Sequence, residues 1–92
     1  MIASFTHRGL RRLYERGDRS GVRPDMLAKT ERILQRLDAI TSPEQMSLPG
    51  YRLHPLAGDK KGFWSVSVNG NWRIIFRFEE GQPCDVDLVD YH

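Results

Sequence analysis

The sequence predicts an α+β fold, with two to three N-terminal helices packed on one face of a small, mostly antiparallel β-sheet. Two observations carry this prediction. Apolar residues recur at helical spacing in the first half of the chain, and they alternate with polar residues at a period of two in the second half. Because the chain has only 92 residues, residues 1–92 are expected to form a single domain with one modest core.

The first helix is expected within residues 7–18, after a short opening strand at residues 1–6. Its apolar positions, at i, i+3 and i+4, are Leu10, Leu13 and Tyr14. Gly17 follows them, and glycine is the residue most suited to the C-terminal cap of a helix. The pattern therefore predicts a short amphipathic helix that ends at this glycine.

A second, longer helix is expected over residues 24–40. Pro24 suits the first position of a helix, and the carboxylate of Asp25 suits the positive end of the helix dipole. The apolar stripe consists of Leu27, Ile33, Leu34, Leu37 and Ile40. In a chain this small, such a stripe is expected to face the core. Residues 42–46 predict one further turn, with Ser42 as its N-cap.

Strands are expected at residues 51–54, 63–68 and 72–79, where apolar and polar residues alternate. The last two are joined by Asn-Gly-Asn at residues 69–71, and the length of this turn sets their register. A three-residue turn pairs Val68 with Trp72, Val66 with Ile74, and Trp64 with Phe76. We favour this register because it buries large apolar side chains together, at roughly 1.5–3 kcal/mol each.

The final strand is expected to place Cys84, Val86 and Leu88 toward the core. Strict alternation would then put Asp90 on the same apolar face. We therefore expect a twist or a bulge near the end of the chain.

The face of the sheet away from the helices is expected to be polar, basic and uncovered. Its residues are Arg52, His54, Ser65, Ser67, Arg73 and Arg77. Such a face suits the binding of a phosphodiester.

Composition limits the classes of function. No apolar run approaches 18 residues, so no membrane partner is expected. The single cysteine, Cys84, excludes an internal disulfide and a cysteine-rich metal site, and it suits a reducing cytoplasm. Residues 1–40 hold nine Lys and Arg against five acids, whereas residues 41–92 hold five against seven. The basic half would face phosphate, an acidic segment of a partner protein, or solvent.

His54, Arg73 and the terminal residues Asp90, Tyr91 and His92 suit metal-independent cleavage of RNA, with no cofactor. That reaction needs a base for the 2′-OH proton, an acid for the 5′-oxygen, and a cation beside the phosphorane. Imidazole titrates near neutral pH, and guanidinium binds phosphate oxygens. The sequence leaves open which group is the acid and which is the base.

Three motifs together resemble the HigB toxins of the RelE/ParE superfamily, along the whole chain: "LHPL-x-GD", "G-x-W-S-x-x-V-x-x-NWRI-x-F" and the terminal "VDYH". The resemblance implies a RelE/ParE-like fold and the toxin of a type II toxin–antitoxin pair. It implies a ribosome-dependent endoribonuclease that cleaves mRNA in the A site of the small ribosomal subunit. The implied protein partner is a HigA-like helix-turn-helix antitoxin.

By this resemblance, the active-site positions are His54, Arg73, Asp90, Tyr91 and His92, and Asn71 touches the mRNA base. One position departs from the family pattern, because Ala57 stands where relatives often have lysine. The loss of one such cation is worth ~10²–10³ in rate. Lys60 and Lys61 are expected to supply the positive charge from the turn, and Arg77 is a further expected RNA-binding residue.

Two other functions fit the same fold. A ParE-like toxin binds DNA gyrase and cleaves no RNA. His54 and the Asp-Tyr-His end argue against this function, because a gyrase-binding toxin does not need acid–base groups. A catalytically weakened member would act mainly by binding its antitoxin, and Ala57 is the residue that favours this alternative.

Overall fold

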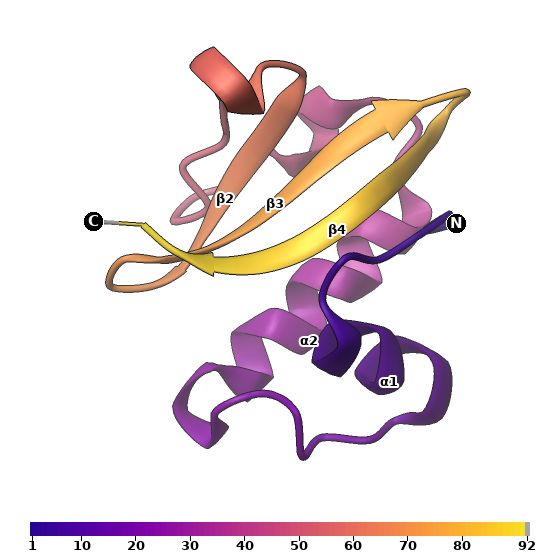
Figure 1. The fold of residues 1–92 in the computed structure, drawn as a ribbon, viewed down its shortest axis with the longest axis vertical. Helices are drawn as coiled ribbons and strands as arrows, with labels where there is room; N and C mark the ends of the chain where they lie inside the picture. Colours follow the sequence, from indigo (N-terminus) through magenta and orange to yellow (C-terminus); the bar gives the residue numbers. More distant parts are fainter. Residues whose placement is uncertain (92) are drawn as a thin grey trace.

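The computed structural model describes residues 1–91, and it has two helices on one face of an antiparallel sheet (Figure 1). The helical elements are α1 (Arg8–Arg16), α2 (Pro24–Ala39) and the 3₁₀ turns η1 (Pro43–Met46) and η2 (Gly58–Lys60). The strands are β1 (His54–Pro55), β2 (Phe63–Asn69), β3 (Trp72–Glu79) and β4 (Gln82–Asp90), in the order β1-β2-β3-β4. The predicted α+β class is therefore confirmed. Within residues 1–91, no helix has the length and apolarity to cross a bilayer.

Helix α1 begins and ends, and helix α2 begins, where local chemistry predicts. Nδ1 of His7 accepts a 3.1 Å hydrogen bond from the backbone N–H of Leu10, so this histidine is the N-cap of α1. Gly17 ends the helix with a φ of 68°, and its N–H returns to the carbonyls of the last turn. In α2, Pro24 and Asp25 lie in the first turn. The capping predictions at Gly17 and Pro24 are confirmed.

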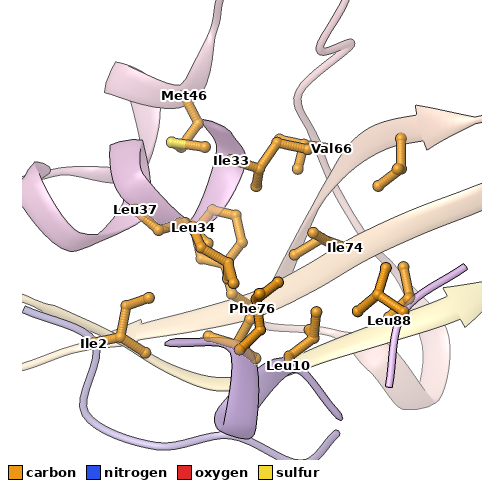
Figure 2. Close-up of a cluster of buried hydrophobic side chains, with 14 of the residues drawn as sticks. Ile2, Leu10, Ile33, Leu34, Leu37, Met46, Val66, Ile74, Phe76 and Leu88 are labelled. Atoms are coloured by element: carbon orange, nitrogen blue, oxygen red, sulfur yellow. The ribbon is translucent and has the colours of Figure 1, made fainter. Parts of the chain in front are cut away.

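The core lies between α2 and the sheet (Figure 2). Ile33 and Leu37 of α2 are fully buried, as are Ile74 and Phe76 of β3. The predicted stripe of α2 is confirmed except at Leu27, which is half-buried. Burial of Met26 and Thr30, which the stripe omitted, shows that the buried face of α2 is wider than the sequence pattern indicated.

The loop between the helices packs on α1 through two glycines. A Cβ atom at Gly9 would lie 2.6 Å from the carbonyl oxygen of Gly21, and one at Gly21 would lie 2.7 Å from the Cα of Gly9. Neither position has room for a side chain, so this approach requires glycine on both sides.

The opening segment pairs with the outer edge of β4. Phe5 forms one parallel bridge with Val86, and the N–H groups of Ala3 and Thr6 donate to the carbonyls of Pro83 and Val86 at 2.8 and 2.9 Å. The expected strand at residues 1–6 is thus reduced to a single bridge.

The predicted register of β2 and β3 is correct in part. Trp64 pairs with Phe76 and Val66 with Ile74, as expected. The third predicted pair, Val68 with Trp72, is wrong, because Trp72 pairs with Asn69 and the register shifts between Ser67 and Asn69. The turn itself is the two-residue Gly70–Asn71, and the bulge at Val68 leaves that side chain buried in the core.

A second bulge lies between β3 and β4. Ile75 pairs with Asp87 but Arg77 pairs with Cys84, and Asp85 has a φ of 51°. The bulge reverses the alternation before it, so Pro83 is buried and Cys84 lies half-buried opposite Arg77. The prediction that Cys84 faces the core is wrong. The twist or bulge expected near Asp90 is not found there, because β4 keeps a regular register with β3 from Asp87 to Asp90. The bulge lies earlier in β4, at Asp85.

Candidate active site

His54 and Arg73, two of the predicted site residues, lie in successive rows across the face of the sheet opposite the helices. Cross-strand partners in an antiparallel sheet share a face, and so do residues two apart along a strand. The first row runs from His54 through Ser65 and Ile75 to Asp87. The next row is Ser67, Arg73 and Val89. The imidazole of His54 and the guanidinium of Arg73 therefore belong to neighbouring rows of one face.

Ser65 and Ile75, which lie between His54 and Arg73 on this face, are buried. Their burial corrects the expectation that the face is uncovered. Ser65 is fully buried and Ile75 is 1% exposed, whereas the sequence had placed Ser65 on an uncovered polar face. Both belong to the central strands of the sheet, β2 and β3. The hydroxyl of Ser65 is within 3.5 Å of Nη1 of Arg73, a long hydrogen bond at the base of the guanidinium.

His54 is oriented by the chain immediately before it. Its Nδ1 lies 3.1 Å from the carbonyl oxygen of Arg52, and Arg52 has a φ of 51°. Because this left-handed residue interrupts the extended chain, the strand expected at residues 51–54 is reduced to β1, and the alternation that put Arg52 beside His54 does not hold. Lys29 of α2 has a lowered pKa, first because of burial and then because of the positive charges of Arg32 and Arg52.

The end of β4 approaches the β2–β3 turn (Figure 1). Asp90 is exposed and pairs with Trp72, and the N–H of Tyr91 donates a 2.7 Å hydrogen bond to the carbonyl of Asn71. In an extended chain Tyr91 shares the face of Val89, and so of Arg73, whereas Asp90 alternates to the other face. Tyr91 is 43% exposed, and it is not part of the core. His92 lies outside the described residues.

The predicted RNA-binding residues fall into two groups. Asn71 lies in the turn after β2, whereas Lys60, Lys61 and Arg77 lie at the opposite end of that strand. Nζ of Lys60 is 5.3 Å from the centroid of the Phe63 ring, and the guanidinium carbon of Arg77 is 6.0 Å from it. Since β2 advances about 3.3 Å per residue, the two groups are roughly 20 Å apart.

Arg77 differs from Arg73 in how its charge is compensated. Its Nη1 lies 3.0 Å from Oδ2 of Asp85, and its Nη2 forms an ion pair with Glu79. The hydrogen bond to Asp85 and the charge of Glu79 raise the pKa of this guanidinium. Within residues 1–91, Arg73 instead donates a long hydrogen bond to the neutral hydroxyl of Ser65. The charge of Arg73 is therefore better placed to bind an anion.

A cluster that the sequence did not single out fixes the turn that carries Asn71. Asp25 accepts hydrogen bonds from Nε and Nη2 of Arg23 at 3.1 and 2.7 Å, and from Nδ2 of Asn69 at 3.2 Å. The hydrogen bond from Arg23 is the main cause that lowers the pKa of Asp25. The guanidinium of Arg23 also lies 5.9 Å from the Trp72 ring centroid. Asn69 is 44 residues from Asp25 along the chain, so no local sequence signal could have found the bond that joins them.

No group of three or more His, Cys, Asp or Glu side chains within residues 1–91 could hold a metal ion. Burial is the main cause that raises the pKa of the Cys84 thiol, followed by the charges of Asp85 and Glu79. Its Sγ lies 3.9 Å from a carboxylate oxygen of Glu79. A thiol held protonated in this way is a poor nucleophile.

Comparison with solved structures identifies the class of the fold. The chain is similar to a chain of the YoeB–YefM complex from Staphylococcus aureus, with a TM-score of 0.62 over 100% of this chain and 98% of that chain. The sequence identity is 12%, so this likeness establishes the fold alone. The class of protein comes instead from a family model, which describes a RelE-like toxin.

Sequence comparison identifies the family. Residues 3–92 match the family described as the RelE-like toxin of the type II toxin–antitoxin system HigB. The chain is 41% identical over 92 residues to the endoribonuclease HigB of Proteus vulgaris, covering 100% of both chains. It is 31% identical over 90 residues to toxin HigB-1 of Vibrio cholerae serotype O1, covering 96% of this chain and 95% of that one. The chain belongs to the HigB-like toxin family, as its sequence motifs predicted.

Proposed function

We propose that this toxin is an endoribonuclease that cleaves mRNA in the ribosomal A site, without a metal ion, in the cytoplasm. The observation that carries the proposal is the placement of His54 and Arg73 in neighbouring rows of one sheet face, with no ion pair formed by Arg73 within residues 1–91. The relative from Proteus vulgaris, which matches over the full chain, is named an endoribonuclease.

The proposed reaction is an internal transfer within RNA. A base removes the proton from a 2′-OH, the 2′-oxygen attacks the adjacent phosphorus, and the 5′-oxygen leaves with a proton from an acid. The products are a 2′,3′-cyclic phosphate and a free 5′-OH. His54 and the Asp90-Tyr91-His92 end supply the candidate acid and base.

Arg73 has the electrostatic role in this proposal. Negative charge grows on the phosphorane oxygens as the new bond forms, and a guanidinium can contact two of them at once. The hydroxyl of the buried Ser65 accepts a long hydrogen bond, 3.5 Å, from Nη1 at the end of this side chain. Loss of the cation should therefore slow the chemical step more than it weakens RNA binding.

Dependence on the ribosome follows from the openness of the site. His54 and Arg73 are half-buried, while Asn71 and Asp90 are exposed, so this face alone encloses no RNA strand. Holding the strand in line for attack can be worth ~7–11 kcal/mol of barrier. In this proposal the ribosome supplies that orientation, because the A site already fixes the mRNA.

The proposed protein partner is a HigA-like helix-turn-helix antitoxin. A related toxin fold occurs in the YoeB–YefM complex, and the family is that of a type II toxin–antitoxin system. Co-expression with the product of a neighbouring short reading frame tests this proposal. A stable co-purified complex that relieves growth arrest is expected, and growth arrest unaffected by such a protein would contradict it.

Transcript mapping after expression in a bacterium without the antitoxin tests the proposed activity. New 5′ ends should appear within coding frames, and purified toxin should cut mRNA on programmed ribosomes much faster than naked mRNA. His54→Gln should lower cleavage by ~10²–10⁴. Intact transcripts together with blocked DNA supercoiling would instead indicate a gyrase-binding toxin.

A further inference from the structure

Three successive carbonyls hold the loop that precedes His54. The carbonyl of Gly50 accepts a 3.1 Å hydrogen bond from Nζ of Lys29, on α2. The carbonyl of Tyr51 accepts a 2.7 Å hydrogen bond from the N–H of Ser67, on β2. The carbonyl of Arg52 lies 3.1 Å from Nδ1 of His54, on β1. The loop is thus tied to three different elements.

Arg52 adopts a left-handed backbone conformation, which residues other than glycine rarely adopt. Its φ is 51°, in the left-handed region, where glycine or asparagine is more common. Such a conformation persists only where the surrounding structure enforces it, and it often occurs at functional sites. Here the hydrogen bonds accepted by the carbonyls of Gly50 and Tyr51 hold Arg52 in this conformation. As a consequence, the carbonyl of Arg52 is directed at His54.

The partner of Nδ1 decides which nitrogen of His54 carries the proton. A carbonyl oxygen can only accept a hydrogen bond, so Nδ1 must be the donor. In the neutral imidazole the other nitrogen, Nε2, then has a free lone pair. Nε2 is also the nitrogen that exchanges a proton when the ring becomes charged, whether His54 acts as base or as acid.

We propose that Arg52 is a positioning residue, whose left-handed backbone directs its carbonyl at His54 and fixes the Nδ1–H tautomer, leaving Nε2 to transfer the proton. The catalytic meaning of this tautomer rests on the proposed ribonuclease function. The role belongs to the backbone, because the group of Arg52 that meets the ring is its carbonyl oxygen. Lys29 also lies over the Tyr51 ring, with Nζ 5.5 Å from the centroid, and so supports the loop from the helix side.

His7 provides an internal control, because its Nδ1 accepts a hydrogen bond whereas that of His54 donates one. Its Nδ1 accepts a hydrogen bond from the N–H of Leu10 at 3.1 Å, so Nδ1 is unprotonated and Nε2 carries the hydrogen. The two neutral histidines should therefore be opposite tautomers.

Long-range ¹H–¹⁵N correlation spectra of the uniformly labelled toxin, at a pH where the imidazoles are neutral, test the tautomers directly. His7→Gln, His54→Gln and His92→Gln assign the three rings. In each ring, Nε2 is the nitrogen that couples to both carbon-bound protons. It should resonate as an unprotonated nitrogen in His54 and as a protonated nitrogen in His7. A protonated Nε2 in His54, or a mixture like that of free imidazole, would overturn the proposal.

Substitutions at Arg52 test the backbone role. Arg52→Gly, which adopts a positive φ freely, should keep the Nδ1–H tautomer. Arg52→Val, whose β-branch opposes this conformation, should shift His54 toward the Nε2–H form. If Arg52→Val does not fold, Arg52→Ala compared with Arg52→Gly gives the same contrast. An unchanged His54 tautomer in folded Arg52→Val or Arg52→Ala would show that Arg52 does not position the ring.

Cleavage on programmed ribosomes tests the consequence separately. Arg52→Val should lower kcat on the order of 10²-fold with KM little changed, and Arg52→Gly should lie much nearer the wild type. A fall of equal size in Arg52→Gly would assign the effect to the guanidinium and overturn the proposal. If the wild type cleaves no RNA while His54 has the expected tautomer, the ribonuclease function fails but the positioning by Arg52 stands.

Discussion

Nδ2 of Asn69 donates a 3.2 Å hydrogen bond to Oδ2 of Asp25, and this bond joins the β2–β3 turn to the first turn of α2. The same carboxylate is held by Nε and Nη2 of Arg23. Asn71, two residues after Asn69, accepts the hydrogen bond of Tyr91. The start of α2 is therefore linked through the turn to the C-terminal end of the candidate site.

Asp25→Asn should lower the melting temperature at neutral pH, because it removes an ion pair and weakens the tie to Asn69. The pKa of Asp25 is lowered from its ordinary value of 3.8 in the folded protein. The ionised carboxylate of Asp25 therefore stabilises the fold at pH values above its pKa in the unfolded chain. This stabilisation is lost as the pH falls through its lower pKa in the folded protein. Thermal melting of both proteins at decreasing pH should show curves that converge in acid.

Asn69→Ala serves as the matched control for this prediction. It removes one hydrogen bond to Asp25 but leaves the Arg23 pair, so its effect at neutral pH should be smaller. A melting-temperature difference between Asp25→Asn and the wild type that stays constant at all pH values would contradict a role for the ionised carboxylate.

Arg73→Met and Arg77→Met should separate in activity, although both remove a guanidinium from the same face of β3. Arg73→Met should lower cleavage by ~10²–10³, because it removes the charge proposed to face the phosphorane. Arg77→Met should have a smaller effect, since Asp85 and Glu79 already balance its charge. Initial rates on programmed ribosomes measure the difference. A larger loss in Arg77→Met would place the phosphate at the other end of the sheet.

Deletion of Tyr91 and His92 should leave the domain folded and abolish or strongly reduce toxicity. Tyr91 is half-exposed, and its hydrogen bond to Asn71 is worth only about 0.5–1.5 kcal/mol. Loss of an acid–base group and its neighbour should cost ~10²–10⁴ in rate. Plating efficiency after induction and circular dichroism measure the two effects. Tyr91→Phe keeps the backbone bond and isolates the phenol. A truncated protein that folds and still arrests growth would exclude these residues from the reaction.

Gly9→Ala should destabilise the fold by about 1–3 kcal/mol, the typical cost of overpacking. The added Cβ would lie 2.6 Å from the Gly21 carbonyl oxygen, and backbone atoms cannot rotate away as a side chain can. Urea unfolding measures the loss. Arg16→Ala, an exposed change in the same helix, should alter stability by no more than about 0.5 kcal/mol. Equal stability of Gly9→Ala and the wild type would show that the loop yields at no cost.

The parts of the fold that the sequence predicted depend on regular periodicity. Ile33 and Leu37 were assigned to the core because helical spacing places them on one face, and both are fully buried. The pairing of Val66 with Ile74 followed from strand alternation in the same way. For the site, the sequence placed His54 and Arg73 on one face, and the register agrees.

The errors lie where one residue departs from that periodicity. The bulges at Val68 and Asp85 each shift the alternation by one position, and the left-handed Arg52 ends it before β1. None of the three is a glycine, so the sequence carries no local signal for these conformations. The burial of Ser65 depends on which strands flank β2, and a single strand cannot reveal that.

The short opening segment affects how copies of the chain can meet. Residues 3–6 cover the outer edge of β4 along its first half, and the opposite edge of the sheet, β1, is only two residues long and includes Pro55. The remaining outer edge of β4, from residue 87 onward, carries Asp87 and Asp90, so two copies that approached by edge pairing would bring like charges together. Unpaired edges of β-sheets are the usual route to aggregation by strand addition. This sheet therefore offers little free edge for strand pairing between copies of the chain.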